Sequence, residues 1–185
     1  VAALTTTQVA GLGSDDLNAL NTTQFAAMTS AQAAALTTDQ IPNLQTADLA
    51  NLSSAALRAW TTTQFDALNS DQMAALTTAQ VAALTTAQVV GLGSDHLNAL
   101  STTQFAAMTT AQVSALTTTQ LSTLVSDDLR ALTTAQYAAL SSVQIAGLTT
   151  DHVTQLESTD LRALTSSTLR GLSSDELAAL NSDQM

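Results

Sequence analysis

Residues 76–83 read Leu-Thr-Thr-Ala-Gln-Val-Ala-Ala, and this octad recurs along the whole chain of 185 residues. In steps of eight from Leu4 to Leu180, the first residue of each octad is Leu, except at Met28, Trp60 and Met108. This gives 23 octads without insertion or deletion, whose positions we number 1 to 8 from that residue. Position 6 is apolar from Val9 to Met185, position 3 is always Ser or Thr, and position 5 is Gln in 14 octads. A fixed period of this kind is the signature of a repeat architecture.

The eight-residue period excludes two simple folds. In one continuous helix, each octad would rotate by about 80° relative to the last, so the Leu row would wrap around the helix and leave no apolar stripe. In a β-solenoid, positions 1 and 6 would face opposite sides of a strand, and Ala is depleted in strands. The chain also has only six Gly and one Pro for tight corners.

A very short capped helix in each octad accounts for every position. Position 2 is Thr, Ser, Asn or Gly in 20 octads, which are the preferred N-cap residues, and Gln at position 5 then completes a capping box. Of the 15 acidic residues, 13 lie at positions 4 or 5, and all four Arg lie at position 7, as the helix dipole favours. Such helices are too short to be stable alone. The sequence therefore predicts an all-α solenoid of about 23 octads, each held by its neighbours.

The remaining positions receive roles from this scheme. Positions 1 and 6 are predicted to form the core, position 8 to permit close contact between turns, and position 7 to face water. The hydroxyl at position 3 has two interpretations: an N-cap where Gly precedes it, at Ser14 and Ser94, or a hydrogen-bonded ladder between turns. We expect Trp60 to fill the core and Pro42 to disturb the end of its short helix.

The repeat covers residues 1–185, which we interpret as one solenoid. Residues 8–29 and 88–109 are nearly identical, which indicates duplication of a segment of ten octads. The chain starts and stops at position 6 rather than at a polar cap, so we expect it to be a segment of a longer array or a unit that stacks on copies of itself.

Composition excludes several classes of function. The net charge of −11, with no Lys, disfavours a nucleic-acid surface, which needs clustered cations. The absence of Cys excludes disulfides and thiol chemistry. No apolar run approaches the roughly 20 residues of a membrane helix, so no membrane insertion is expected.

No residue pattern predicts catalysis, a cofactor or a metal site. His96 and His152 both replace Gln at position 5 and are interpreted as capping variants. Asp15–Asp16 and Asp127–Asp128 lack the spacing of calcium loops and are interpreted as acids at helix N-termini, with weak calcium binding as the alternative. The repeated Gly-Leu-Gly of residues 11–13 and 91–93 lacks the context of a phosphate loop. We therefore expect no enzyme.

The consensus octad and its Leu-Gly-Ser-Asp-Asp-Leu-Asn-Ala variant at residues 12–19 resemble the octapeptide repeat arrays of large secreted or surface bacterial proteins, which are adhesin-like. The resemblance covers the whole chain and implies an extracellular structural role, as a filament, sheath, stalk or spacer. The expected partner is the chain itself, stacked end to end, or flanking repeats of the same parent chain. The alternative is a solenoid that binds a peptide or glycan, with Asp127–Arg170 as the candidate segment, and a minor alternative is an ice-binding Thr-rich surface.

Overall fold

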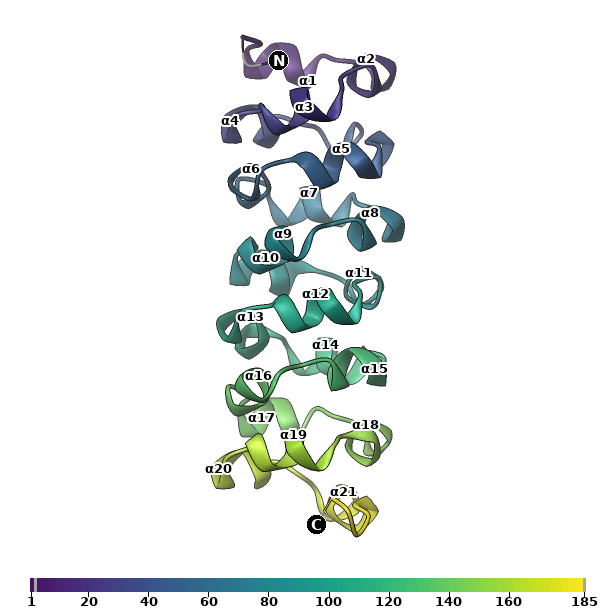
Figure 1. The fold of residues 1–185 in the computed structure, drawn as a ribbon, viewed down its shortest axis with the longest axis vertical. Coiled ribbons are helices and arrows are strands. Elements are labelled where there is room, and N and C mark those ends of the chain that lie inside the picture. Colours follow the sequence, from purple (N-terminus) through teal and green to yellow (C-terminus); the bar gives the residue numbers. More distant parts are fainter. Residues whose placement is uncertain (2, 185) are drawn as a thin grey trace. The chain divides into compact units, whose positions relative to one another are not determined.

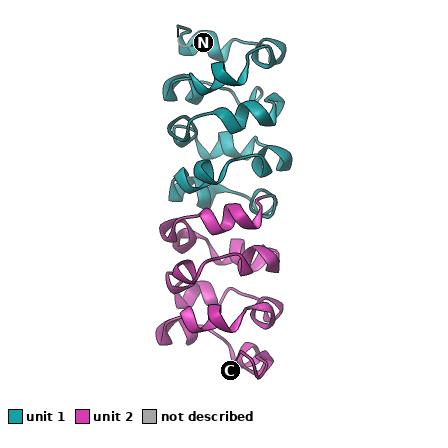
Figure 2. Ribbon diagram, viewed as in Figure 1, with its two compact units in different colours: residues 1–99 teal, residues 100–185 magenta. Residues whose placement is uncertain are grey.

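The computed structural model describes residue 1 and residues 3–184, and over these residues it confirms an all-helical repeat fold without strands (Figure 1). The predicted core residue Met185 lies outside the described residues. The chain divides into two compact units, Val1–Ala99 and Leu100–Met185 (Figure 2). In each unit, helices of four to six residues alternate with sharp bends, one helix to an octad.

The helices begin two residues after the position-1 Leu. Those of the first unit are α1 (Thr6–Ala10), α2 (Ser14–Asn18), α3 (Thr22–Ala26), α4 (Ser30–Ala34), the 3-10 helix η1 (Ile41–Asn43), α5 (Thr46–Asn51), α6 (Ser54–Arg58), α7 (Thr62–Asp66), α8 (Ser70–Ala74), α9 (Thr78–Ala83), α10 (Thr86–Gly91) and α11 (Ser94–Asn98). Those of the second are α12 (Thr102–Ala107), α13 (Thr110–Ala115), α14 (Thr118–Thr123), α15 (Ser126–Arg130), α16 (Thr134–Ala138), α17 (Ser142–Ile145), α18 (Thr150–Gln155), α19 (Ser158–Ala163), α20 (Ser166–Leu169) and α21 (Ser174–Ala179).

The predicted caps start the helices. At α9, the Thr77 hydroxyl accepts the backbone N–H of Gln80 at 3.2 Å, and Gln80 Oε1 accepts the backbone N–H of Thr77 at 2.8 Å. The helix then ends at Leu84, whose extended backbone (φ −57°, ψ 145°) turns the chain into the next octad. Each octad thus carries its own start signal at position 2 and its own bend at the following position 1.

Coiling of the octads brings each helix onto the helix three octads away. In the first unit, α1 packs on α4 and α6 on α9; in the second, α16 packs on α19 and α17 on α20. Because an isolated helix of five residues is unstable in water, these contacts between successive coils supply the stability of the fold.

The core is built as predicted from positions 1 and 6. In the octad at 76–83, Leu76 and Val81 are buried, and no described residue at position 7 is buried. Leu169 and Leu177 are the exceptions at position 6, with 36% and 48% of their surface exposed. The octads that would cover them lie three places further along, beyond residue 184. The prediction that these two residues are buried is therefore wrong.

Small residues at position 8 permit close contact between coils, as predicted. A Cβ added to Gly91 would lie 2.7 Å from Thr62 Cγ2, and one added to Gly147 would lie 2.8 Å from Thr118 Cβ. Both contacts join position 8 to position 3 of the residue 29 places earlier. Position 3 is thus the surface on which the next coil rests.

One interpretation of position 3 is wrong and the other is confirmed in part. Gly13 and Gly93 are themselves the N-caps of α2 and α11, so Ser14 and Ser94 are the first helical residues and not the caps. Glycine adopts the extended N-cap backbone without a side-chain acceptor. The ladder exists at Ser30, whose hydroxyl donates to the carbonyl of Ala55 in the next coil at 3.1 Å.

Pro42 has a larger effect than predicted. Its octad forms no α-helix: residues 38–40 make a turn, followed by η1. Because proline has no backbone N–H, it cannot bond to the carbonyl four residues earlier. The capping bonds between Thr37 and Gln40 persist, at 2.8 and 3.2 Å, so the octad keeps its place in the coil.

Candidate functional site

The most constructed feature of the molecule is a row of buried side chains at position 5. Gln72 on α8 is 1% exposed. Its Oε1 accepts the backbone N–H of Asn69 at 3.0 Å, while its Nε2 donates to the carbonyls of Ile41 and Leu44, both at 2.8 Å. These carbonyls lie 31 and 28 residues earlier, in the preceding coil. One carboxamide therefore caps its own helix and fastens two coils together.

The same bridge recurs in both units. Residues that donate to carbonyls 31 and 28 places earlier are Gln32, Gln40, Gln72, Gln80 and Gln88 in the first unit and Gln136, Gln144 and Gln184 in the second. Because the spacing lies between 28 and 31, a coil closes between three and four octads. Buried amide bonds of this kind are costly to break, since each leaves backbone groups without partners.

The sequence analysis recognised the cap at position 5 and missed the bridge. A signal was available: the helix dipole favours a carboxylate at this place, yet Gln occurs 14 times and Glu only at Glu176. A carboxylate accepts hydrogen bonds but donates none. The preference for Gln therefore reports a donor that the cap does not need.

The two histidines reproduce the amide with a ring. At His152, Nδ1 accepts the backbone N–H of Thr149 at 3.2 Å, and Nε2 lies 2.9 Å from the carbonyl of Leu124. At His96, Nε2 lies 2.8 Å from the carbonyl of Leu68, and Nδ1 lies 3.7 Å from Asp66 Oδ1. Their interpretation as capping variants is confirmed for His152. For His96 it is wrong, because its ring nitrogen is turned towards Asp66.

Aspartates at position 5 leave the bridge incomplete. Asp48 and Asp128 are 3% and 4% exposed, and Oδ2 of each is buried without a hydrogen-bond partner. Burial raises the pKa of Asp48, and burial together with the neighbouring charge of Asp127 raises the pKa of Asp128 to about 6. Asp160 accepts the backbone N–H of Glu157 at 3.2 Å, and burial still raises its pKa against the lowering effect of Arg130.

The other predicted residues are structural. Asp15 and Asp16 lie in the first turn of α2, as Asp127 and Asp128 do in α15. Within the described chain, no three side chains of His, Cys, Asp or Glu gather as a metal site would require. Trp60 is buried as predicted, and its Nε1 donates to the carbonyl of Ala33 at 2.8 Å. None of the helices in the described ranges has the length and apolarity that crossing a bilayer requires.

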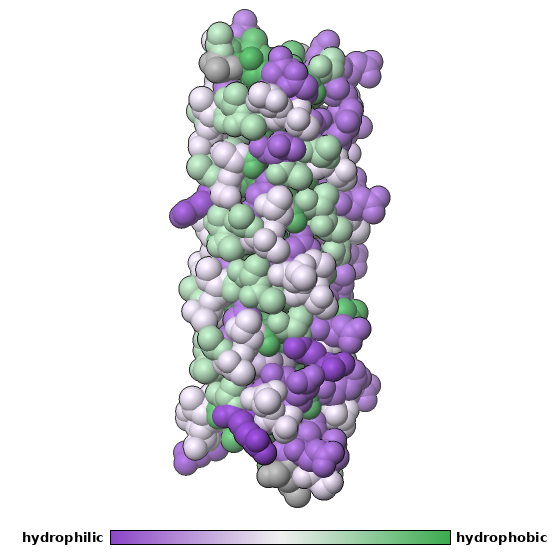
Figure 3. All heavy atoms as spheres, in the orientation of Figure 1, coloured by the Kyte–Doolittle hydropathy of each residue, from purple (hydrophilic) through white to green (hydrophobic). Residues whose placement is uncertain are grey.

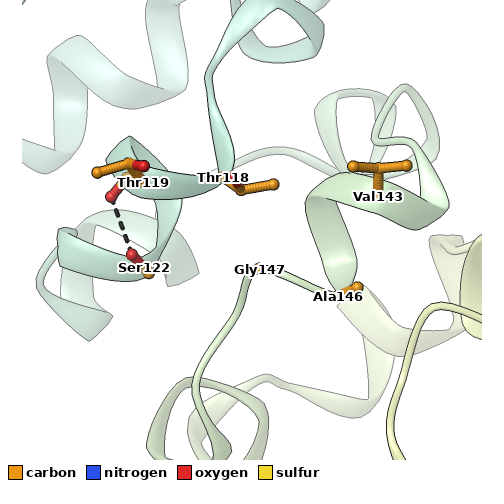
Figure 4. A pocket seen from close by; sticks show the side chains of 6 residues that line it. All are labelled: Thr118, Thr119, Ser122, Val143, Ala146 and Gly147. Carbon is orange, nitrogen blue, oxygen red and sulfur yellow. Dashed lines mark hydrogen bonds between the residues drawn. The ribbon is translucent and has the colours of Figure 1, made fainter.

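The candidate binding segment Asp127–Arg170 lies within the second unit and carries an exposed charge cluster. Arg130 lies 3.3 Å from Glu157 and 3.7 Å from Asp127. A shallow hollow reaches this segment from α14 and α17 and is lined by Thr118, Thr119, Ser122, Val143, Ala146 and Gly147 (Figure 4). Val143 is 68% exposed, whereas Ser122 donates to the carbonyl of Thr119 at 2.9 Å.

The visible surface of the molecule is a fine mosaic of weakly apolar and polar side chains (Figure 3). Larger apolar side chains are exposed at the C-terminal edge of the second unit, where Leu164, Leu169, Leu172, Leu177 and Leu180 line one hollow. At the N-terminal edge of the first unit, the position-1 residues Leu4, Leu12 and Leu20 are only half-buried. Both edges are coil faces that are covered elsewhere in the array.

Comparison with known proteins agrees with the repeat. The family model described as the ALTTAQ repeat matches six overlapping segments, at residues 9–46, 41–78, 73–102, 92–126, 124–158 and 153–185. No curated protein and no solved structure matches the chain.

Proposed function

Because the chain belongs to the ALTTAQ repeat family, we propose that its function is structural: it builds an extended array of coils that serves as a filament, sheath, stalk or adhesin spacer. The observation that carries the proposal is the amide row at position 5. Each coil presents carbonyl acceptors to the coil that follows and Gln donors to the coil that precedes it. An interface that repeats in this way has no natural limit, so it continues wherever another coil of the same kind is supplied.

The two edges support stacking of whole chains. Oε1 of Gln8 and of Gln24 accepts a backbone N–H within its own octad, as in the interior. For their Nε2 groups, however, residues 1 and 3–184 supply no acceptor, because the carbonyls 28 and 31 places earlier would precede the chain. The C-terminal edge offers exposed leucines and carbonyls of the complementary kind. We propose that a second copy, or flanking repeats of a parent chain, covers both edges.

Electron microscopy across a range of protein concentrations tests this proposal. The proposal predicts uniform filaments whose mean length increases with concentration, because head-to-tail contact is an open association. Discrete short particles at every concentration would contradict self-stacking. The matched control is a chain with Leu169→Glu and Leu177→Glu, which places charge on the exposed C-terminal edge and is expected to abolish the filaments.

An extracellular or cell-surface location is part of the proposal. It is supported by the acidic composition without Cys or Lys and by the resemblance to surface repeat arrays. Antibody labelling of intact and permeabilised cells distinguishes the two locations. Equal labelling before and after permeabilisation is expected, whereas labelling only after permeabilisation would contradict it. The proposal contains no catalytic step.

A second candidate function is the binding of a peptide to the second unit. The observation that favours it is the exposed Val143 beside the hollow over α14 and α17, next to a segment that carries three of the four arginines. An extended solenoid surface suits a peptide ligand. Binding of an acidic, leucine-containing peptide library by the wild-type chain, and its loss in Val143→Asp, would support this function. Equal binding by both chains would contradict it.

A further inference from the structure

Side chains at position 5 meet position 7 of the residue 30 places earlier. Where position 5 is Gln and position 7 is Ala, the contact is made to the backbone: Nε2 of Gln64 and of Gln80 lies 3.1 and 3.2 Å from the carbonyls of Ala34 and Ala50. The tip of the position-5 side chain therefore lies directly over position 7 of the coil before it.

Where position 7 carries a polar side chain, position 5 often carries its complement. Asp66 faces His96 at 3.7 Å. Arg130 acts on the carboxyl of Asp160, whose pKa it lowers against the effect of burial. Asn18 and Asp48, at the same spacing, each bury one oxygen that has no partner. These pairs are recognition elements between coils, because an octad placed in the wrong register would meet a different residue.

The two edges of the chain carry unpaired members of the same pattern. At the N-terminal edge, position 5 is occupied by Gln8, Asp16 and Gln24, whose position-7 counterparts would precede residue 1. At the C-terminal edge, position 7 is occupied by Arg162, Arg170 and Ala178, whose position-5 counterparts would follow residue 185. Asp16 and Arg170 are both exposed and carry opposite charges.

We propose that a second copy of the chain docks on the C-terminal edge with an offset of 184 residues, which is 23 octads, and that contact between its Asp16 and Arg170 of the first copy selects this register. The proposal rests on the end-to-end stacking proposed above and specifies its geometry. At this offset Gln8 of the second copy reaches the carbonyls of Leu161 and Leu164, and Gln24 reaches those of Leu177 and Leu180. All four carbonyls are at positions 6 and 1, where interior amides bind.

Alternative registers lose these matches. An offset one octad shorter would place the second copy in the volume of the last octad of the first. An offset one octad longer would place Asp16 over Ala178 and leave Arg170 facing Gln8. Only the offset of 184 residues combines an Arg–Asp contact of the Arg130–Asp160 kind with complete amide bridges on both sides. At this offset Val1 of the second copy and Met185 of the first fall on the same position 6, so one of these two side chains leaves the core.

Charge reversal tests the register by sedimentation velocity over a concentration series. Arg170→Asp alone and Asp16→Arg alone are each expected to raise the apparent dissociation constant about tenfold, because attraction becomes repulsion. An equimolar mixture of the two variants is expected to restore association to within about twofold of wild type, since each edge then meets an opposite charge. The chain that carries both changes should behave as the mixture does.

Asp15→Arg is the matched control, because it changes the charge of the same helix at position 4, and it is expected to change the dissociation constant less than about twofold. If wild type associates but the mixture is no stronger than either variant alone, the register is wrong and stacking stands. If wild type does not associate at any concentration, stacking and register are both overturned. Rescue by mixing also answers the objection that Asp16→Arg disturbs α2, because a damaged edge would not recover.

Discussion

Helices α8 and α5 occupy equivalent places in their octads, both in the first unit, and they differ at the two residues that matter most. In α8, the Asn69 side chain caps the helix and Gln72 joins it to the preceding coil through two carbonyls. In α5, the N-cap Gln45 makes no side-chain cap bond, and Asp48 buries an oxygen that has no partner. The comparison teaches that position 5 requires an acceptor and a donor on one side chain, and that the fold tolerates an octad with only the acceptor because its neighbours hold it in place.

Removing the bridge from α8 should have the largest effect. Gln72→Ala leaves the N–H of Asn69 and the carbonyls of Ile41 and Leu44 without the amide partner, and it creates a cavity. We expect a loss of about 3 kcal/mol in the free energy of unfolding, measured by urea denaturation. Gln8→Ala is the matched control, because Gln8 is exposed and bridges no carbonyl, and its expected loss is below about 1 kcal/mol. Equal losses in the two variants would contradict a role of the bridge.

The pH dependence of Asp128 tests the cost of a carboxylate at position 5 in the second unit. Its folded pKa of about 6 lies above the ordinary value of 3.8, so the folded state binds the proton more tightly than the unfolded state does. This contribution to stability is complete below pH about 4 and is lost as the pH rises through about 6.

Asp128→Asn removes this titration. We therefore expect Asp128→Asn to be more stable than wild type by about 2 kcal/mol at neutral pH, with the difference vanishing near pH 4. Urea denaturation of both chains at several pH values measures it. A difference that does not change with pH would show that the carboxyl of Asp128 titrates normally.

Converting α5 to the pattern of α8 should stabilise the chain by a smaller amount. Asp48→Gln supplies the missing donor over the carbonyls of Leu17 and Leu20, which lie 31 and 28 residues earlier, and it removes a buried charge. The expected gain is about 1 kcal/mol in thermal or urea denaturation at neutral pH. A loss of stability would mean that Asn18, which lies 30 residues before Asp48, excludes the longer side chain.

The smallest expected effect is at the cap of α5. Gln45→Thr places a hydroxyl where Thr77 has one in α9, so that it can accept the backbone N–H of Asp48. The expected gain is about 0.5 kcal/mol, at the low end of values for N-cap residues. Thr77→Ala is the reverse change and should lose about 1 kcal/mol. Opposite signs for the two variants are required; the same sign would contradict the assignment of position 2 as the cap.

Sequence reasoning recovered the local structure because the octad contains its own signals. The cap at position 2, the apolar pair at positions 1 and 6 and the acids of the first turn depend only on residues within one octad. What depends on the next coil could not be obtained in this way. The period of 28 to 31 residues is set by packing, so the partners of Gln72 and the complement of Asp66 and His96 appear only once the coils are stacked.

The errors of the sequence analysis have the same origin. Ser14 was assigned a capping role because Gly13 has no side chain, but the extended backbone of Gly13 starts the helix without one. Leu169 and Leu177 were assigned to the core from their position in the octad, although burial at position 6 also requires the coil that follows. A repeat pattern predicts which face is apolar, and only the stack decides whether that face is covered.

Hydrogen exchange of the glutamine side-chain amides tests the central claim most directly. If Nε2 of Gln72 donates to two buried carbonyls in the preceding coil, its protons should exchange with D2O at least about a hundredfold more slowly than those of exposed Gln8, as followed by 15N-resolved NMR. The account predicts slow exchange for every bridging Gln within the units. Exchange of Gln72 at the rate of Gln8 would contradict it, because the coils would then be held together without the amide row.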